Sequence, residues 1–410
     1  MKSLRIAILT TEFVTEWASG GGVGNFLQRL ARAFKETGHE PEVFVISSEE
    51  KAFDFCGIRV ERVRPLDRKL FSIAEWYLRK YIPGYQVGPH RQELGANLRM
   101  AWSLNRALER RHSEQPFDLV HSTTLAASGL FVRRKRNRSH ICFVTSNFVA
   151  GLQEYGSPLN LSAKLLLWIQ LTALHKANQV YAHSQLLSDY YVHEYRIPVR
   201  KVFPPMFIEA EPVERVSFEL PDRYLIHFGL IGTLKGSDLV AQALSLAWQQ
   251  EPGLRMIWAG TEVQPNTIDS YRALWAHHAS NVNWLGSLEK PVLYAVLKRA
   301  IASVLPSRVD NLPNTVSESL LFGIPVIGSR GASIDELVED GSSGALVPIG
   351  NVDALAAAML RAWRGQASWL GTGFQPPRTL SELDPEVAVT NLLRLAGFEN
   401  ETNNFNGAWT

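Results

Sequence analysis

The sequence has 410 residues, which is more than one hydrophobic core usually supports, so we expect two domains. Its 42 basic and 40 acidic residues leave a net charge of +2, which excludes an overall polyanion-binding character and gives no indication of nucleic acid as a partner. The two cysteines, Cys56 and Cys142, lie far apart without partners at metal-ligand spacing, so a reducing, cytoplasmic compartment is expected.

Short apolar runs rich in strand-forming residues recur along the chain and alternate with segments of helical length. One series begins at residues 5, 42, 118, 141, 179 and 201. A second series begins at residues 224, 255, 282, 302, 325 and 344. Continuous apolar strands separated by helices predict parallel sheets covered on both faces, so the two series predict two doubly wound α/β domains.

The predicted domain boundary lies near 203–222, where proline and acidic residues become denser and helical periodicity lapses. A helix is expected from about 352, and a last helix near 384–396 precedes a polar tail at 397–410. The N-terminal run fits a first strand better than a signal peptide, and no stretch approaches the ~20 apolar residues of a membrane span.

A glycine loop, Gly20 to Gly22, follows the first strand and precedes a strongly amphipathic helix. Backbone can approach a phosphate closely at such a loop. The spacing does not match a dinucleotide fingerprint, which disfavours a dehydrogenase. The alternative is that these glycines only allow a tight turn between strand and helix.

Two basic segments have mainly structural interpretations. The segment 66–91 interleaves aromatic with basic residues, which is typical of an amphipathic helix on an anionic membrane or of an ordinary surface helix, and we favour the second. The basic run 133–138 is expected to be a solvated helix end.

In the second half, the strand that ends at Gly229 is followed by a loop with Gly232 and Lys235 and by a helix that opens near Gly236. Lys235 could reach an anion, or it could be a solvated surface residue. The spacing of these glycines and of Lys235 does not match that of a P-loop.

The stretch "DNLPNTVSESLLFGIPVIGS", 310–329, places Asp310 in a loop just before a short helix. Thr315 and Glu318 have the spacing of a capping box, and Gly323 ends the helix before a buried strand. Because a helix N-terminus attracts anions, this loop is a natural seat for a phosphate. The alternative is that Glu318 only closes the capping box and Asp310 is a solvated acid.

These three stretches, in this order, resemble the family 4 glycosyltransferases of the GT-B fold over nearly the whole chain. "DNLPNTVSES" is similar to the family's E-x(7)-E motif, with Asp310 in place of the first glutamate and Glu318 matching the second. The resemblance implies an α/β GT-B fold, in which two Rossmann-like doubly wound domains face each other across a cleft. It places the acceptor on domain 1–205 and the donor on domain 206–383, with the helix at 384–396 packing back on the first.

The resemblance implies roles for individual residues. Glu318 would hold the ribose hydroxyls of a nucleotide, Asp310 a hydroxyl of the donor sugar, and Lys235 the phosphate, so these three are the catalytic candidates. Carboxylates accept paired hydrogen bonds from vicinal diols, which agrees with these assignments. The expected donor-binding residues are Gly21, Gly22, Gly232, Arg308, Asn311, Leu312, Pro313, Asn314, Thr315 and Val316.

The sequence also departs from the family pattern. Leu230 stands where the family usually carries an arginine, and Arg308 or Arg330 could substitute for that cation. Thr123 stands where many members carry a histidine facing the reacting sugar. The acceptor-side candidates are His121, Thr123 and Asn147, although His121 lies inside a predicted strand and is more often structural there.

The implied activity is transfer of a sugar from a UDP- or GDP-linked donor to a hydroxyl of a glycan, lipid-linked or small acceptor, in bacterial-type glycan, polysaccharide or glycolipid synthesis. Retention at the anomeric carbon, without a metal or other cofactor, is implied by the resemblance alone. The sequence agrees only in lacking a metal-type Asp-x-Asp cluster. A catalytically silent nucleotide-sugar binder and a nucleotide-sugar epimerase stay open as alternatives, as does peripheral membrane contact through 66–91.

Overall fold

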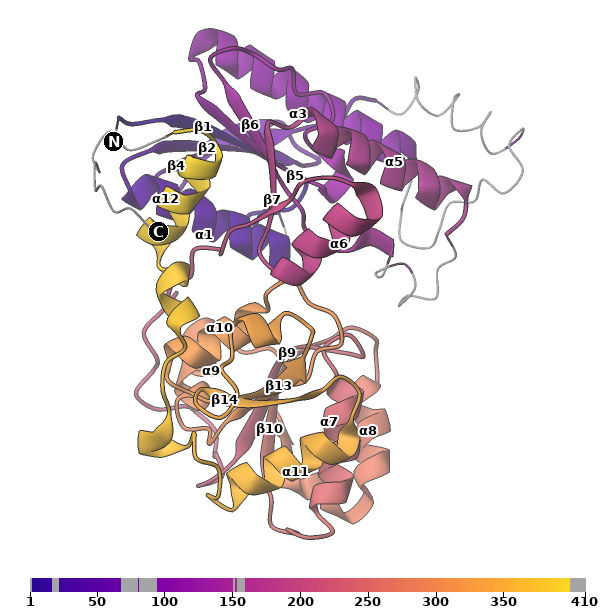
Figure 1. Ribbon diagram of the computed structural model, residues 1–410, viewed down its shortest axis with the longest axis vertical. Helices are drawn as coiled ribbons and strands as arrows, with labels where there is room; N and C mark the ends of the chain where they lie inside the picture. Colours follow the sequence, from indigo (N-terminus) through magenta and orange to yellow (C-terminus); the bar gives the residue numbers. More distant parts are fainter. Residues whose placement is uncertain are drawn as a thin grey trace, which may run out of the picture. The chain divides into compact units, whose positions relative to one another are not determined.

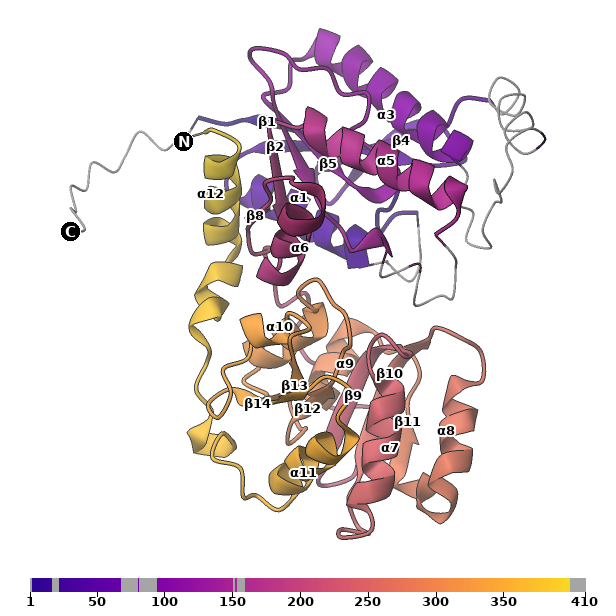
Figure 2. The ribbon, with the colours of Figure 1, turned by 45° about the vertical axis from the view of Figure 1, so that its right-hand side comes forward.

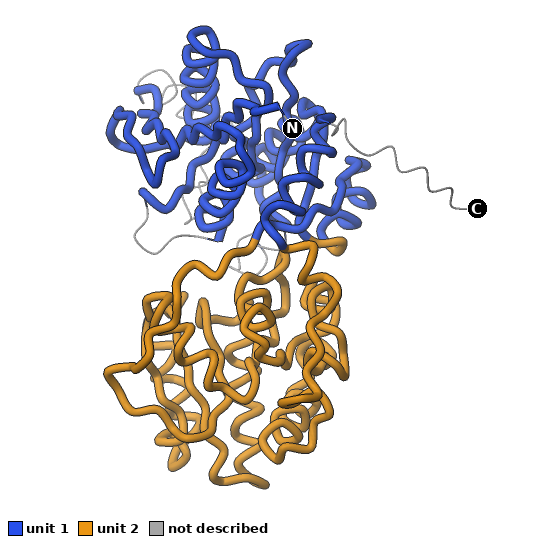
Figure 3. The backbone as a smooth tube through the Cα atoms, turned by 90° about the vertical axis from the view of Figure 1, so that its left-hand side faces the viewer, with its two compact units in different colours: residues 1–183, 187–205, 384–410 blue, residues 184–186, 206–383 orange. Residues whose placement is uncertain are grey.

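The computed structural model describes residues 2–16, 22–67, 80, 94–149, 152 and 159–398. The chain divides into two compact units, drawn in different colours in Figure 3. Unit 1 comprises residues 1–183, 187–205 and 384–410, and unit 2 comprises residues 184–186 and 206–383. Helix α12 (Pro385–Leu395) therefore belongs to unit 1, where it packs against helix α1 (Gly22–Glu36).

Unit 1 is built on an eight-stranded sheet in the order β3-β4-β2-β1-β5-β6-β7-β8 (Figure 1). Neighbouring strands pair in parallel, apart from the antiparallel pair β3 and β4. The strands are β1 (Arg5–Thr10), β2 (Glu40–Ile46), β3 (Lys51–Phe55), β4 (Ile58–Val63), β5 (Leu119–Thr123), β6 (Ser139–Phe143), β7 (Gln179–Ala182) and β8 (Arg200–Lys201).

Helices cover both faces of this sheet, as right-handed crossovers in opposite directions require. Figure 1 shows α1 on one face and α3 with α5 on the other. The α3 side is a core in which Leu104 and Leu108 pack on Ala7 and Leu9 of β1. Among the described residues, the other helical segments of unit 1 are α3 (Leu94–Glu114), η1 (Leu125–Ala127), α5 (Leu161–Lys176) and most of α6 (Gln185–Tyr195).

Unit 2 has a six-stranded parallel sheet in the order β11-β10-β9-β12-β13-β14. The strands are β9 (Leu225–Ile231), β10 (Met256–Glu262), β11 (Val282–Trp284), β12 (Ser303–Leu305), β13 (Val326–Arg330) and β14 (Gly344–Pro348). The helices are α7 (Ser237–Ala247), α8 (Thr267–Trp275), η2 (Ala276–Asn281), α9 (Lys290–Leu297), α10 (Asn314–Leu321), η3 (Ile334–Glu336), α11 (Val352–Trp363), η4 (Gly371–Gly373) and η5 (Arg378–Leu383).

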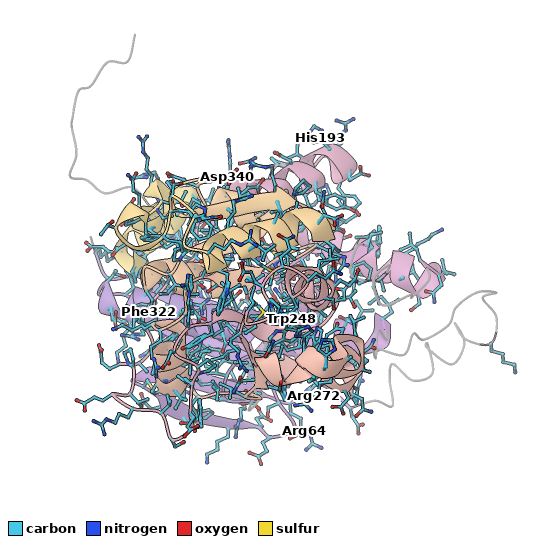
Figure 4. The ribbon with its side chains drawn as sticks, turned by 90° about the horizontal axis from the view of Figure 1, so that it is seen from below. Arg64, His193, Trp248, Arg272, Phe322 and Asp340 are labelled. Carbon is cyan, nitrogen blue, oxygen red and sulfur yellow. The ribbon has the colours of Figure 1, made fainter. Side chains whose placement is uncertain are left out.

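The core of unit 2 lies between its sheet and the layer formed by α7, α8 and α11, which Figure 2 shows at the front. Four buried tryptophans occupy it, Trp248, Trp258, Trp275 and Trp369, and Figure 4 labels Trp248. The rings of Trp248 and Trp258 lie 6.2 and 5.4 Å from that of Trp275, each close to edge-on. This aromatic cluster anchors the helical layer against β10.

The prediction of two doubly wound α/β domains and all the predicted strands are confirmed, but the sequence analysis did not predict the hairpin of β3 and β4. Its turn residues Cys56 and Gly57 both have positive φ, 54° and 75°, as the tight turns of two-residue hairpins require. From Ala52 to Phe55 the side chains alternate in exposure, with the two phenylalanines on the less exposed face, which is a period-2 signal that could have predicted this edge.

The prediction that 133–138 is a solvated helix end is wrong. These residues form a turn before β6, closed by a bridge between Lys135 and Arg138. Arg138 is buried and pairs with Glu109 at 2.7 Å. Arg134 donates to two carbonyls at the C-terminal end of α5, at 3.1 Å each. One basic residue of the run therefore does cap a helix, but that helix is α5 and not one that the run itself forms.

Some predictions concern residues outside those described. They include Gly20 and Gly21 of the glycine loop and nearly all of the basic aromatic segment 66–91. Within the described residues, no helix combines the length and the apolar character needed to cross a membrane.

Candidate functional site

The sheet of unit 2 has a topological switch point between β9 and β12. The chain runs from β9 outward to β11 and then returns to place β12 on the other side of β9. In open α/β sheets, ligands bind beyond the carboxyl ends of the strands at this point. The two loops that leave β9 and β12 there are 232–236 and 306–313, which contain Lys235 and Asp310.

Lys235 and Asp310 meet directly in an ion pair between Nζ and Oδ2. Their side chains are 29% and 13% exposed, so the pair is partly accessible to solvent. The other carboxylate oxygen of Asp310 accepts a hydrogen bond from the backbone N–H of Asn311 at 3.0 Å. Two of the three catalytic candidates are therefore in contact, although they lie 75 positions apart in the sequence.

Glu318 lies one turn into α10, and its side chain is only 5% exposed. Its Oε1 accepts from the ammonium group of Lys290, which lies at the start of α9. The same ammonium lies 5.4 Å over the ring of Tyr294 and 3.9 Å from Glu209. Glu318 is thus a buried carboxylate held by a cation from a neighbouring element.

The predicted capping box of Thr315 and Glu318 is wrong. Helix α10 begins at Asn314, with Pro313 in the cap position and no side-chain cap hydrogen bond. Thr315 therefore lies inside the first turn, where it cannot act as a cap. The backbone N–H of Val316 donates to the Pro313 carbonyl at 3.1 Å, whereas that of Thr315 has no acceptor among the described residues.

Gly229 brings the end of β9 against the start of α10. It has φ of 113°, and a Cβ at this position would lie 3.0 Å from Cγ2 of Thr315. A larger residue would therefore push the strand end away from the helix. The loop after β9 and the N-terminus of α10 consequently lie side by side.

The loop 310–313 is held in an unusual conformation. Leu312 has φ of 61° and is buried, and its N–H donates to Oγ of Ser333 at 2.9 Å. Ser333 also has positive φ, 59°, and its hydroxyl donates to the Asp310 carbonyl at 3.1 Å. Such backbone costs about 1–3 kcal/mol per residue and is concentrated at functional sites. Asn311, next in the loop, accepts from the hydroxyl of Ser184 at 3.0 Å.

The arginines considered as substitutes for the missing cation are both engaged. Arg308 forms a bidentate pair with Asp238 at 2.6 Å for each contact, and also donates to the carbonyl of Thr233. Arg330 pairs with Asp340 on the surface at 2.5 Å. Leu230, which stands in the arginine position, is 53% exposed. Because Arg308 is fixed by Asp238 of α7 and also contacts the carbonyl of Thr233, it tethers the 232–236 loop.

The acceptor-side candidates of unit 1 are mostly buried. His121 is fully buried and its Nε2 lies 2.7 Å from the hydroxyl of Tyr181. Burial lowers the pKa of His121 to about 3, so the ring is neutral. Thr123 is also buried, and its N–H donates to Oγ of Ser128. These contacts favour the structural interpretation of His121 and Thr123.

Two further candidates of unit 1 are more accessible. Asn147 is partly exposed in the segment after β6. Gly22 is exposed as the first residue of α1, and no described residue lies within 4 Å of the position that a Cβ would take. Gly21 lies outside the described residues.

Sequence reasoning missed Lys290 and Ser333. Lys290 pairs with a residue 28 positions away, and this contact depends on how α9 and α10 are placed by the sheet. Ser333 fixes the carboxylate loop from the segment after β13. Neither has a local motif that signals its role.

A metal centre finds no support in the described residues, which contain no group of three or more His, Cys, Asp or Glu side chains placed to hold an ion. The metal independence of the reaction stays a prediction.

Solved structures give the fold. The sucrose-phosphate synthase from Thermosynechococcus elongatus superposes with a TM-score of 0.70 at 18% identity, over 96% of this chain and 98% of its own. Anabaena HepE, whose crystal structure contains UDP and glucose, superposes with a TM-score of 0.66 at 14% identity, over 96% of this chain and 99% of its own. The fold is that of the GT-B glycosyltransferases.

Sequence comparison gives the family. Residues 20–204 match the family described as Glycosyltransferase Family 4, and residues 222–364 match the one described as Glycosyl transferases group 1. The chain belongs to the family 4 glycosyltransferases. A D-inositol 3-phosphate glycosyltransferase from Jonesia denitrificans is 29% identical over 153 residues, which are 35% of this chain. The chain thus spans only 36% of the length of that relative.

Proposed function

We propose that the protein transfers a sugar from a nucleoside diphosphate sugar to a hydroxyl acceptor, and that unit 2 binds the donor. The observation that carries this proposal is the convergence of Lys235, Asp310 and the start of α10 at the switch point of unit 2. Family membership agrees with it. Unit 1 would then supply the acceptor side.

The nucleoside would be held by Glu318. A carboxylate can accept hydrogen bonds from two vicinal hydroxyls, such as those of a ribose. Lys290 donates to Oε1 of Glu318 and so fixes the orientation of the carboxylate. Because Glu318 is buried, its hydrogen bonds to a ligand would be little weakened by competing water.

The diphosphate would be held by the loop after β9. The backbone N–H groups of Thr233, Leu234 and Lys235 have no acceptors among the described residues. Together with the Lys235 ammonium and the N–H of Thr315, they are donors suited to a leaving diphosphate, whose charge increases as the glycosidic bond breaks. The ammonium group of Lys235 contacts Asp310, so donor binding there would exchange a carboxylate for a phosphate.

That exchange would release Oδ2 of Asp310 toward the sugar. The carboxylate could then accept a hydrogen bond from a donor sugar hydroxyl, as the resemblance implies. UDP-glucose is the first donor to test, because UDP and glucose occupy the HepE structure. The sugar, the acceptor, the pathway, retention at the anomeric carbon and a cytoplasmic location stay part of the proposal.

The decisive experiment combines binding with product analysis. A ligand present at 100 times its dissociation constant should stabilise the protein by about 2.7 kcal/mol, so a thermal-shift screen over UDP- and GDP-sugars should identify the donor. NMR of the products would separate transfer to an acceptor from epimerisation, and turnover should survive EDTA. Absence of any shift across the panel would overturn the proposal, and loss of activity in EDTA that magnesium or manganese restores would overturn metal independence.

A second candidate is a catalytically silent nucleotide-sugar binder. Leu230 favours it, because an exposed apolar side chain stands where relatives carry a cation. Slow hydrolysis of the identified donor in the absence of acceptor would argue against it.

A further inference from the structure

A buried histidine lies directly beneath the loop that carries Lys235. His227 belongs to β9 and is 1% exposed. Its Nδ1 lies 2.7 Å from the carbonyl oxygen of Val304 on β12. Because a carbonyl can only accept, Nδ1 carries the proton and Nε2 must be the acceptor. Burial lowers the pKa of His227 to about 4, which keeps the ring neutral.

The acceptor nitrogen of His227 determines the direction of the next hydrogen bond. Nε2 lies 2.9 Å from Oγ of Ser237, the first residue of α7. Ser237 is fully buried. The serine hydroxyl therefore donates to His227. Its oxygen is left to accept, and it receives the backbone N–H of Gly232 at 2.9 Å.

This chain of hydrogen bonds fixes both backbone groups of Gly232. Its N–H donates to Oγ of Ser237, and its carbonyl accepts the N–H of Ser237 at 3.2 Å. Gly236 closes the loop with φ of 70°, and a Cβ there would lie 2.1 Å from the carbonyl oxygen of Pro306. With both ends of the loop fixed, the N–H groups between them are the ones left for a ligand.

We propose that His227 and Ser237 are positioning residues that preset the 232–236 loop for the donor diphosphate. They act through the Gly232 N–H, which they hold against the buried hydroxyl of Ser237. The N–H groups of Thr233, Leu234 and Lys235 are then left to face the ligand together. This inference rests on the proposed function, because it requires that a nucleoside diphosphate bind at this loop.

Two substitutions at position 227 separate positioning from packing. His227→Gln can place a carbonyl oxygen near the position of Nε2 and so keep the acceptor for Ser237. His227→Asn can place an amide N–H near Nδ1 and so keep the contact with Val304, but it loses the acceptor. If the histidine only fills the core, the two variants should differ in stability and not in affinity for the ligand.

The experiment measures the affinities of UDP, GDP, uridine and guanosine by calorimetry for the wild type, Ser237→Ala and both His227 variants. We expect Ser237→Ala and His227→Asn to weaken diphosphate binding about tenfold, with the nucleoside affinity unchanged and with His227→Gln close to wild type. Thermal melting without ligand shows whether each variant is folded. Ser237→Ala provides the test if either His227 variant fails to fold.

The outcomes distinguish this inference from the proposed function. If the wild type binds neither diphosphate, both fail. If the wild type binds one of them and folded Ser237→Ala binds it equally well, only the positioning role is overturned. An equal loss of nucleoside and diphosphate affinity in Ser237→Ala would also overturn it, because the effect would then not be specific to the diphosphate.

Discussion

The two units share one architecture but differ in the polar groups near the carboxyl ends of their strands. Unit 2 has partly accessible ion pairs there, such as Lys235 with Asp310 and Arg308 with Asp238. Unit 1 also has an ion pair, Arg62 with Glu16, at the β4 side of its sheet, but at β5 it has buried neutral groups, such as His121 hydrogen-bonded to Tyr181. Partly exposed charges at strand ends can bind an anion, whereas buried neutral groups stabilise a core. The difference teaches that a doubly wound sheet provides a location for a site, and that its side chains determine whether an anion can bind there.

The largest effect is expected at Glu318. Substitutions there would show whether the charged groups near the carboxyl ends of the strands of unit 2 form a binding site. Glu318→Ala should abolish nucleotide binding, because it removes the acceptor for the ribose and leaves Lys290 without its main partner. Glu318→Gln should fold well and bind weakly. Calorimetry with UDP and GDP measures both. Unchanged affinity in the two variants would show that Glu318 has only a structural role.

Lys235 should have the next largest effect. Removing one preorganised donor to a developing oxyanion typically costs about 2.7–4 kcal/mol, so Lys235→Ala should lower turnover by roughly 10² to 10³. Arg330→Ala is a matched control, because it removes another cation of unit 2 from an exposed pair. If Lys235→Ala stays active while Arg308→Ala or Arg330→Ala is inactive, the diphosphate is held from the carboxylate loop instead.

Lowering the pH should reduce the free energy of unfolding of unit 1 more than that of unit 2. Burial lowers the pKa of His121 and of His140 to about 3, and places that of His183 well below its usual value. Below pH 6.5 the unfolded chain binds protons that these buried rings do not, so the free energy of unfolding falls as the pH falls from 6.5 toward 3. Each histidine contributes a loss of about 1.4 kcal/mol per pH unit in that window. Among the described histidines of unit 2, His227 is the fully buried one with this behaviour, and its lowered pKa is about 4.

Tryptophan fluorescence provides the measurement. The fluorescence change comes mainly from unit 2, because Trp248, Trp258 and Trp275 are buried there, whereas Trp102 and Trp168 of unit 1 are already exposed in the folded protein. Circular dichroism reports both units. Urea titrations at pH 7 and pH 5 should show a larger loss of stability by circular dichroism than by fluorescence. An equal loss by both probes would contradict the difference between the units.

The sequence was sufficient for those features that depend on local pattern. It placed Asp310 in a loop and Glu318 on the following short helix, because the loop, the helix and the glycine stop occur in one continuous stretch. Lys290 and the contact between His227 and Val304 could not, because these pairs join residues 28 and 77 positions apart. Such contacts follow from strand order and crossover direction, and both were unknown before the sheet was seen.

The smallest effect is expected at Leu230, which stands where the family resemblance implies a cation. The side chain is 53% exposed, so Leu230→Arg buries no new charge and should leave stability nearly unchanged. An exposed charge pair contributes about 0.2–1 kcal/mol, so we expect a gain in diphosphate affinity of no more than about fivefold. Leu230→Gln is the control of similar size without charge. Because an arginine here and Lys235 would act on the same phosphate, the gain should change when Lys235 is replaced by alanine, and a double-mutant cycle measures that coupling. Strict additivity would place position 230 away from the diphosphate, and the exposed leucine would then be an ordinary surface residue.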